Sequence, residues 1–211
     1  MLEKIKRRIE KHQAQPIGEQ RTFAVFLPLV KVDEEWHVLY EVRSNHISQP
    51  GETSFPGGAV EEGESFEEAA VRETMEELNV SKESIEVYGE IDFIFNQSHH
   101  IRCFVGELKH INPDQLQPNE EVASVFTIPL RYLKENEPEY HTVTLKTEYN
   151  HDFPFELISN GKKYKFGKRK HKVPFYRLPN QFLWGFTADF THRFIEIISE
   201  DTNFLEGKNE K

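Results

Sequence analysis

Two stretches in the first quarter of the chain read as β-strands, the first a nearly continuous apolar run and the second an alternation of apolar and polar residues. They are Arg21–Val32 and Trp36–Arg43, separated by an acidic turn at 33–35. Pro28 lacks a backbone N–H, so we expect the first strand to lie at a sheet edge or to be broken there. Residues 44–57 follow as a loop that is rich in proline and glycine. The pattern therefore predicts a strand pair followed by a long loop.

Further strands are predicted in the middle of the chain. Ile85–Phe95 and Ile101–Leu108 read as a pair joined by a turn at 96–100, and Val122–Ile128 reads as another strand. Polar and aromatic residues over 142–166 indicate hairpins.

Three segments have the apolar spacing of amphipathic helices, namely 1–14, Ser65–Leu78 and 181–199. Pro129 opens a fourth, short helix. We expect the first helix to cap the domain. The phenylalanines that we expect on the core face of the last helix are Phe186, Phe190 and Phe194. Strands outnumber helices and one helix lies mid-chain, which predicts an α/β sandwich.

Composition adds limits to this picture. The 211 residues predict one domain at 21–200, with a helical extension at 1–20 and a polar tail at 201–211. A net charge of −10 argues against general nucleic-acid binding. Cys103 is the only cysteine, which excludes an intramolecular disulfide. The chain has no run of 18 apolar residues and no apolar signal core at its start, so we expect a cytoplasmic protein without a membrane partner.

The segment from Gly58 to Val80 has the most specific chemistry. Glu73, Glu76 and Glu77 are spaced three and four residues apart, which places three carboxylates on one face of a helix. Like charges at these spacings repel each other. A hard cation such as Mg²⁺ would relieve the repulsion, because it prefers carboxylate oxygens. An ordinary solvated, glutamate-rich helix is the alternative.

The spacing across this segment resembles the signature box of the Nudix hydrolases. The positions in register are Gly58, Glu64, Arg72, Glu73, Glu76, Glu77 and Val80. Thr74 stands where an aliphatic residue is usual, and Asn79 stands where a second glycine is usual. Asparagine tolerates the left-handed conformation that ends helices, so the second departure is mild. The resemblance implies a mixed β-sheet sandwiched between helices.

The resemblance also implies a reaction, the divalent-metal-dependent hydrolysis of a phosphoanhydride in a nucleoside diphosphate derivative. Mg²⁺ or Mn²⁺ would be the cofactor. Glu73 and Glu77 are the expected metal ligands, with Glu76 sharing the site and the Gly58 carbonyl completing it. The expected catalytic residues are Glu76 and an ion pair of Arg72 with Glu64, which orients the site. The general base stays open between Glu76 and two loop acids, Glu120 and Glu121.

The loop before the box resembles that of the coenzyme A pyrophosphatase branch. The residues that carry this resemblance, and that we expect to bind substrate, are Arg43, Ser44, Phe55 and Gly57. Ser48 stands where that branch has a basic residue, and the spacer that follows is one residue short. A purely structural role for this turn is the alternative.

These resemblances imply that coenzyme A or acyl-CoA is cleaved to 3′,5′-ADP and 4′-phosphopantetheine, acylated if the thiol is. ADP-ribose, a nucleotide sugar or NADH are alternative substrates, and a silent nucleotide sensor is a third reading. The basic run Lys162–Lys172 is either a solvated hairpin edge or a grip for an additional phosphate. The expected partner is a small nucleotide, and a homodimer stays open.

Overall fold

The computed structural model describes residues 1–14, 16–96 and 98–199, and its centre is a seven-stranded mixed sheet. The order along the sheet is β3-β2-β1-β6-β5, with β4 paired to β1 and β7 paired to β2. The bounds are β1 Arg21–Val32, β2 Glu35–Arg43, β3 Thr53–Ser54, β4 Gly57–Ala59, β5 Ile85–Phe95, β6 His99–Leu108 and β7 Val122–Pro129. β1 and β6 run parallel, whereas β2 and β5 are antiparallel to their neighbours.

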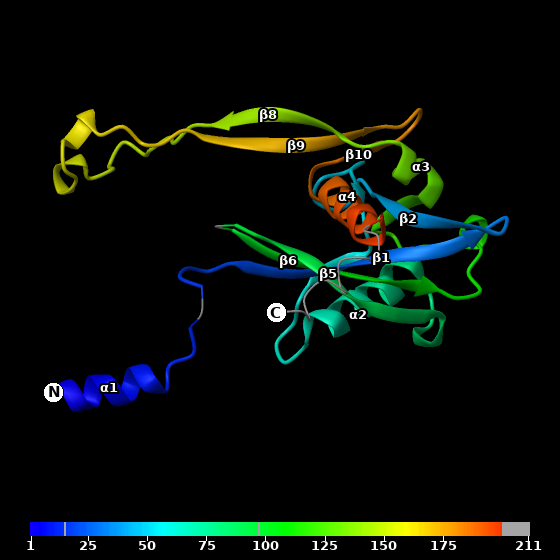
Figure 1. Ribbon diagram of the computed structural model, residues 1–211, viewed down its shortest axis with the longest axis horizontal. Helices are drawn as coiled ribbons and strands as arrows, with labels where there is room; N and C mark the ends of the chain where they lie inside the picture. The colour runs from blue at the N-terminus through cyan, green and yellow to red at the C-terminus, as the bar shows by residue number, and fades with distance from the viewer. Residues whose placement is uncertain (15, 97, 200–211) are drawn as a thin grey trace, which may run out of the picture.

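Helices cover both faces of this sheet. Helix α2 (Phe66–Leu78) lies on one face and α4 (Gly185–Ser199) lies on the other (Figure 1). Ala69, Ala70 and Leu78 of α2 pack with one set of sheet residues, and Phe190 and Phe194 of α4 pack with the other. The predicted α/β sandwich is therefore confirmed.

The position of β1 corrects one prediction. Pro28 lies in the middle of the sheet, because β1 pairs with β6 on one side and with β4 and β2 on the other. β4 pairs with β1 up to Val25, and β2 pairs with it from Leu29 onward. The N–H of Phe26 points to the β4 side, so the missing N–H of Pro28 falls in the gap between the two partners. A central strand tolerates proline here because no ladder hydrogen bond is lost.

Helix α2 begins and ends where its local chemistry requires. Ser65 and Glu68 form a reciprocal capping box at the start. Asn79 ends the helix in the left-handed conformation with φ 51°. Thr74 is fully buried and donates a hydrogen bond from Oγ1 to the Ala70 carbonyl at 2.7 Å. Both departures from the signature box are thus accommodated without strain on the carboxylates.

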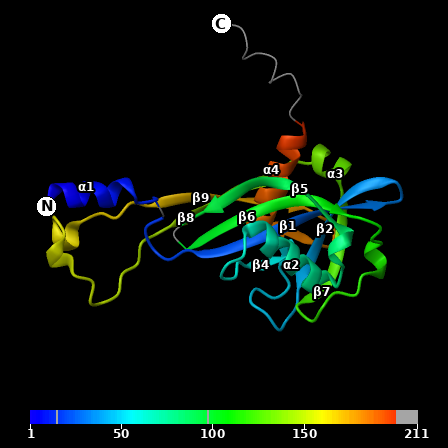
Figure 2. The same ribbon diagram turned by 90° about the horizontal axis from the view of Figure 1, so that it is seen from below.

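The region after β7 differs from the prediction in its boundaries. Helix α3 (Leu130–Glu135) forms as expected, and β8 (Glu139–Leu145) follows. The strand that pairs with β8 is β9 (Arg169–Arg177), so one long hairpin replaces the hairpins predicted within 142–166. Its tip contains short 3₁₀ turns at Phe155–Leu157 and Gly161–Lys163. Elsewhere in the described chain, 3₁₀ turns precede β5 at Lys82–Ser84 and β7 at Pro113–Gln115. Figures 1 and 2 show this hairpin reaching away from the sheet.

Two further boundaries differ. Residues 181–184 do not join the last helix, because β10 (Phe182–Trp184) pairs with β9 and Gly185 turns the chain with φ 61°. As a result Phe186 is 39% exposed, and the prediction that it lines the core is wrong. β6 begins at His99, so the turn before it is shorter than predicted.

Helix α1 (Leu2–Glu10) has no buried residue, so the expectation that it caps the domain is wrong. Its apolar residues Leu2, Ile5 and Ile9 are all exposed. No helix in the described ranges is long and apolar enough to cross a membrane. The predicted polar tail at 201–211 lies outside the described residues.

Candidate functional site

Four carboxylates from three parts of the chain gather at the end of α2. Glu73 and Glu77 come from α2, Glu41 comes from β2, and Glu121 comes from the loop before β7. Glu41 is 1% exposed and Glu77 is 4% exposed. The Ser54 hydroxyl donates to Glu41 Oε1 at 2.8 Å, and the Gly57 N–H donates to Glu77 Oε2 at 2.8 Å. The loop before α2 thus holds both buried acids in place.

Burial and mutual repulsion raise the pKa values of Glu41, Glu73 and Glu77. Burial, followed by the charge of Glu41, raises the pKa of Glu77 to about 9. Burial also raises the pKa of Glu41 to about 7, against the hydrogen bond from Ser54. The pKa of Glu73 is raised by burial, against its ion pair with Arg72. Negative charges packed this closely need a proton or a cation to balance them.

Arg72 joins the box loop to the helix. Its Nε and Nη2 donate to the two oxygens of Glu64 at 2.9 and 3.1 Å, and Nη2 also donates to the Ala59 carbonyl at 3.1 Å. Nη1 donates to Glu73 at 2.8 Å and to Glu76 at 3.4 Å. These partners raise the pKa of Arg72 further, with Glu64 the largest influence. The ion pair between Arg72 and Glu64 that the resemblance implied is therefore present.

Gly58 is required by close packing against the helix. A Cβ built at this position would lie 2.2 Å from Glu73 Oε1. At the neighbouring Gly57, a Cβ would lie 2.3 Å from the Ala24 carbonyl oxygen. The two glycines therefore let β4 lie between β1 and α2, which brings the main chain against the carboxylates.

The donor set fits a hard divalent cation. Carboxylate oxygens suit Mg²⁺ and Mn²⁺. Glu41 Oε2 is buried without a hydrogen-bond partner among the described residues. The acids are not already arranged around one point, since no group of three His, Cys, Asp or Glu side chains in the described ranges forms a ready metal cage. Glu73 is turned toward Arg72 and Glu77 toward Gly57, and Glu76 is exposed.

The two loop acids predicted as alternative bases occupy different places. Glu121 is close enough to raise the pKa of Glu41, Glu73 and Glu77 through its charge. Glu120 has no such influence on any of the three. The structure therefore brings Glu121 to the carboxylate cluster.

Glu41 was missed from the sequence. It stands in the middle of a strand whose neighbours Leu39 and Tyr40 are fully buried. A charged residue inside such an apolar run is costly to bury and therefore points to a functional role. Its pairing with Glu77 depends on how β2 lies across from α2, which no local pattern shows.

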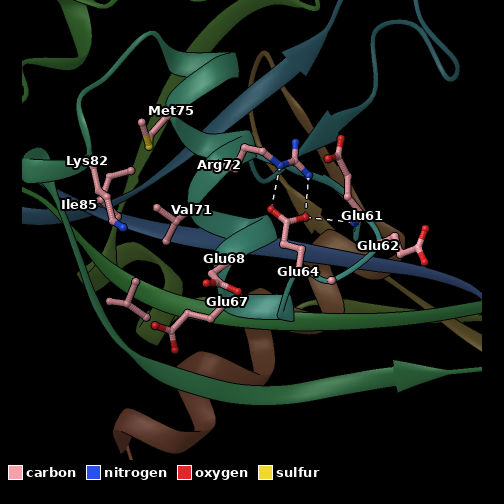
Figure 3. Close-up of a pocket in the computed structure, with 12 residues that line it drawn as sticks. Glu61, Glu62, Glu64, Glu67, Glu68, Val71, Arg72, Met75, Lys82 and Ile85 are labelled. Carbon is pink, nitrogen blue, oxygen red and sulfur yellow. Dashed lines mark hydrogen bonds and ion pairs between the residues drawn. The ribbon is translucent and has the colours of Figure 1, made fainter.

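A pocket on the outer flank of α2 is separate from the cluster. Its volume is about 520 Å³, and its lining includes Glu64, Arg72, Met75 and Lys82. Figure 3 shows the bidentate ion pair between Arg72 and Glu64 at this pocket, with further acids around it. Neither Glu73 nor Glu77 lines it.

The predicted substrate-binding residues are divided between surface and core. Arg43 donates from Nε to the Ser48 carbonyl at 2.8 Å, and lines a second cavity of about 330 Å³. Ser44 is buried, and its hydroxyl accepts from the His46 N–H. Phe55 is 3% exposed and stacks on Tyr40, so its side chain belongs to the core. Gly57 acts through its backbone contact with Glu77.

The basic run Lys162–Lys172 covers the tip of the long hairpin and the start of β9. Arg169 to Lys172 are exposed. His171 is the one residue of the run that lines the 330 Å³ cavity among the described residues.

A carboxylate cluster beside a helix and a glycine turn, on a mixed sheet between helices, is suited to binding a divalent cation. A family profile for the NUDIX domain matches residues 20–146. The chain belongs to the Nudix hydrolase family.

Alignments with related proteins cover more of the chain than the family profile does. Nudix hydrolase 3 of Caenorhabditis elegans is 29% identical over 191 residues, which cover 84% of this chain and 73% of the relative. The uncharacterized Nudix hydrolase NudL of Pectobacterium atrosepticum is 26% identical over 188 residues, covering 88% and 86%. The structure of a MutT/nudix family protein from Enterococcus faecalis has a TM-score of 0.53 at 16% identity and covers 94% of this chain and 70% of that one. The last similarity concerns the fold.

Proposed function

We propose that the protein hydrolyses the phosphoanhydride of coenzyme A or acyl-CoA to 3′,5′-ADP and 4′-phosphopantetheine, acylated where the substrate is. The observation that carries the hydrolytic part is the buried carboxylate cluster of Glu41, Glu73 and Glu77 beside the glycines of β4. Coenzyme A as the substrate rests on the loop that contains Arg43 and Ser44, which resembles that branch of the family.

The carboxylates would hold Mg²⁺ or Mn²⁺, which neutralises phosphate charge and lowers the pKa of water. Glu73 and Glu77 would ligate the ion, with Glu76 and the Gly58 carbonyl as further ligands. Glu41 adds a fourth acid, and its Oε2 has no hydrogen-bond partner in the described part of the chain. Arg72 positions Glu73 through a 2.8 Å ion pair, and Glu64 holds Arg72.

Two acids are candidates for the general base. Glu76 is exposed and joined to Arg72 only at 3.4 Å, so it is able to turn toward a bound substrate. Glu121 lies at the cluster and is also exposed.

The second candidate function is hydrolysis of another nucleoside diphosphate derivative, such as ADP-ribose, a nucleotide sugar or NADH. The observation that favours it is Ser48, which replaces the basic residue of the coenzyme A branch and instead holds Arg43. A silent nucleotide sensor is less consistent with an intact set of acids. We also propose a cytoplasmic location and a homodimer.

A product assay tests the proposal. Purified protein is incubated with coenzyme A and Mg²⁺ or Mn²⁺, with and without EDTA, and products are separated by chromatography, with ADP-ribose, NADH and a nucleotide sugar alongside. We expect 3′,5′-ADP to form from coenzyme A fastest, and only without EDTA. Glu76→Gln should abolish turnover while leaving the fold intact. Faster cleavage of another substrate would discard coenzyme A, and a fully active Glu76→Gln would overturn the role of Glu76.

A further inference from the structure

A cavity of about 330 Å³ lies between the β9–β10 strand pair and the loop that precedes helix α2. Trp184 is the last residue of β10 and Phe186 lies in the first turn of α4, whereas Arg43 ends β2 and Glu52 lies just before β3. The Thr187 hydroxyl donates to the Thr53 carbonyl at 3.1 Å, which joins the two walls. The cavity is therefore built by segments more than a hundred residues apart.

Two aromatic rings give this cavity a stacking surface. Trp184 is 40% exposed and Phe186 is 39% exposed. Trp184 also stacks on Phe175 with the rings 5.8 Å apart and only 6° from parallel, which holds the plane of the indole. Large aromatic faces that stay open to a cavity are suited to a planar ring, because stacking on a base is favourable for every nucleobase.

The charged side chains that line the cavity have opposite signs, so their charges balance. Arg43 supplies one positive charge and Glu52 supplies one negative charge. His171 adds an imidazole from β9. A cavity without excess positive charge suits an uncharged ring with hydrogen-bonding edges better than an additional phosphate.

The cavity adjoins the carboxylate cluster. Ser54 lines the cavity and also donates to Glu41 at 2.8 Å. Arg43 follows Glu41 by two residues, at the end of β2. A ligand that fills the cavity and extends past Arg43 and Ser54 would approach the buried Glu41.

We propose that this cavity binds the nucleobase of the substrate, stacked against Trp184 and Phe186, with the phosphates leaving it past Arg43 toward Glu41 and Glu77. The inference rests on the proposed hydrolysis of a nucleoside diphosphate derivative and names the part of the substrate that the cavity selects. For coenzyme A, the adenine end lies inside and the pantetheine arm lies outside. Specificity for the base therefore comes from β9, β10 and α4, which follow the matched family domain.

Tryptophan fluorescence tests this placement without turnover. The chain has two tryptophans, and Trp36 lies on the β1–β2 hairpin, so Trp36→Phe leaves Trp184 as the sole reporter. With EDTA present, 3′,5′-ADP and AMP should quench this emission saturably, whereas 4′-phosphopantetheine should not. Absence of quenching by either nucleotide, or equal quenching by 4′-phosphopantetheine, would overturn the inference.

Matched variants test the stacking surface by calorimetric titration with 3′,5′-ADP in EDTA. Trp184→Ala should weaken binding about tenfold or more, since stacking on one base is commonly worth that much. Phe186→Leu, which keeps an apolar side chain, should weaken it less. Phe182→Ala is the control, because Phe182 is on the same strand, 75% exposed and outside the cavity. Equal weakening by Phe182→Ala would contradict the stacking role, and circular dichroism verifies the fold of each variant.

The outcomes separate this inference from the proposed function. Saturable quenching by nucleotides without hydrolysis of coenzyme A would support the nucleobase cavity and discard coenzyme A as the substrate. Hydrolysis of coenzyme A without any quenching of Trp184 would keep the proposed function and overturn the cavity.

Discussion

Glu77→Gln should stabilise the metal-free protein at neutral pH, although it removes an expected metal ligand. Glu77 is 4% exposed and lies beside Glu41, and its amide replacement still accepts a hydrogen bond from the Gly57 N–H. The ordinary pKa of this carboxyl is 4.5, whereas in the folded protein the pKa is about 9. Between these values the native state keeps a proton that the unfolded chain has lost, so stability falls as pH rises through this window.

The magnitude follows from proton linkage. One proton retained by the native state costs about 1.4 kcal/mol of stability per pH unit. From pH 5 to pH 7, the free energy of unfolding of the variant should therefore gain up to about 2.7 kcal/mol on that of the wild type. Carboxyls distant from Glu77 titrate in the same way in both proteins, so their contributions cancel in the difference.

The assay is urea unfolding at pH 5, 6 and 7 with EDTA, followed by circular dichroism. Glu76→Gln is the matched control, because it makes the same substitution one residue away on α2, where the side chain is 56% exposed, so it should change the pH dependence far less. Added Mg²⁺ should stabilise the wild type at pH 7 and stabilise Glu77→Gln less. Parallel pH profiles for the wild type and Glu77→Gln would refute the reasoning, since Glu77 would then ionise normally in the folded state.

Three further changes test other parts of the molecule. Gly58→Ala should lower kcat about 100-fold, because its Cβ would lie 2.2 Å from Glu73 and displace that carboxylate; wild-type kcat with Mg²⁺ would contradict this. Glu121→Gln should lower kcat about 100-fold if it is the base, with Glu120→Gln within about twofold of wild type, and equal effects in steady-state kinetics would remove the distinction. Deletion of residues 2–10 should leave the melting temperature unchanged, because α1 buries no residue; a lower value by calorimetry would reveal a contact.

The elements with local signals were predictable from the sequence. The strand Arg21–Val32 has the predicted bounds, and the helix that starts after Ser65 follows its capping box and its left-handed Asn79. The box places its acids by helical spacing alone, so the clustering of Glu73 and Glu77 needed no tertiary information.

What sequence reasoning missed depends on contacts between distant segments. Pro28 was placed at an edge or a break because the sequence does not show how β1 is paired. The strand tolerates this proline since it lies between the residues that pair with β4 and those that pair with β2. Glu41 was missed because its partner lies on another element, and Phe186 was assigned to the core because the turn at Gly185 was not recognised. The roles of the predicted site residues stay predictions until the variants are measured.

The parallel pairing of β1 with β6 has a consequence for how the protein folds. β1 residues 21–29 pair with β6 residues 99–107, so the connection between them contains β2, β4 and α2. Every acid of α2 and Glu41 thus sits within one crossover that closes only when these distant strands meet. Such closure is slow, because the loop entropy is lost before the contacts form. Refolding should therefore assemble the carboxylate cluster late, and a divalent cation should then slow unfolding more than it speeds folding.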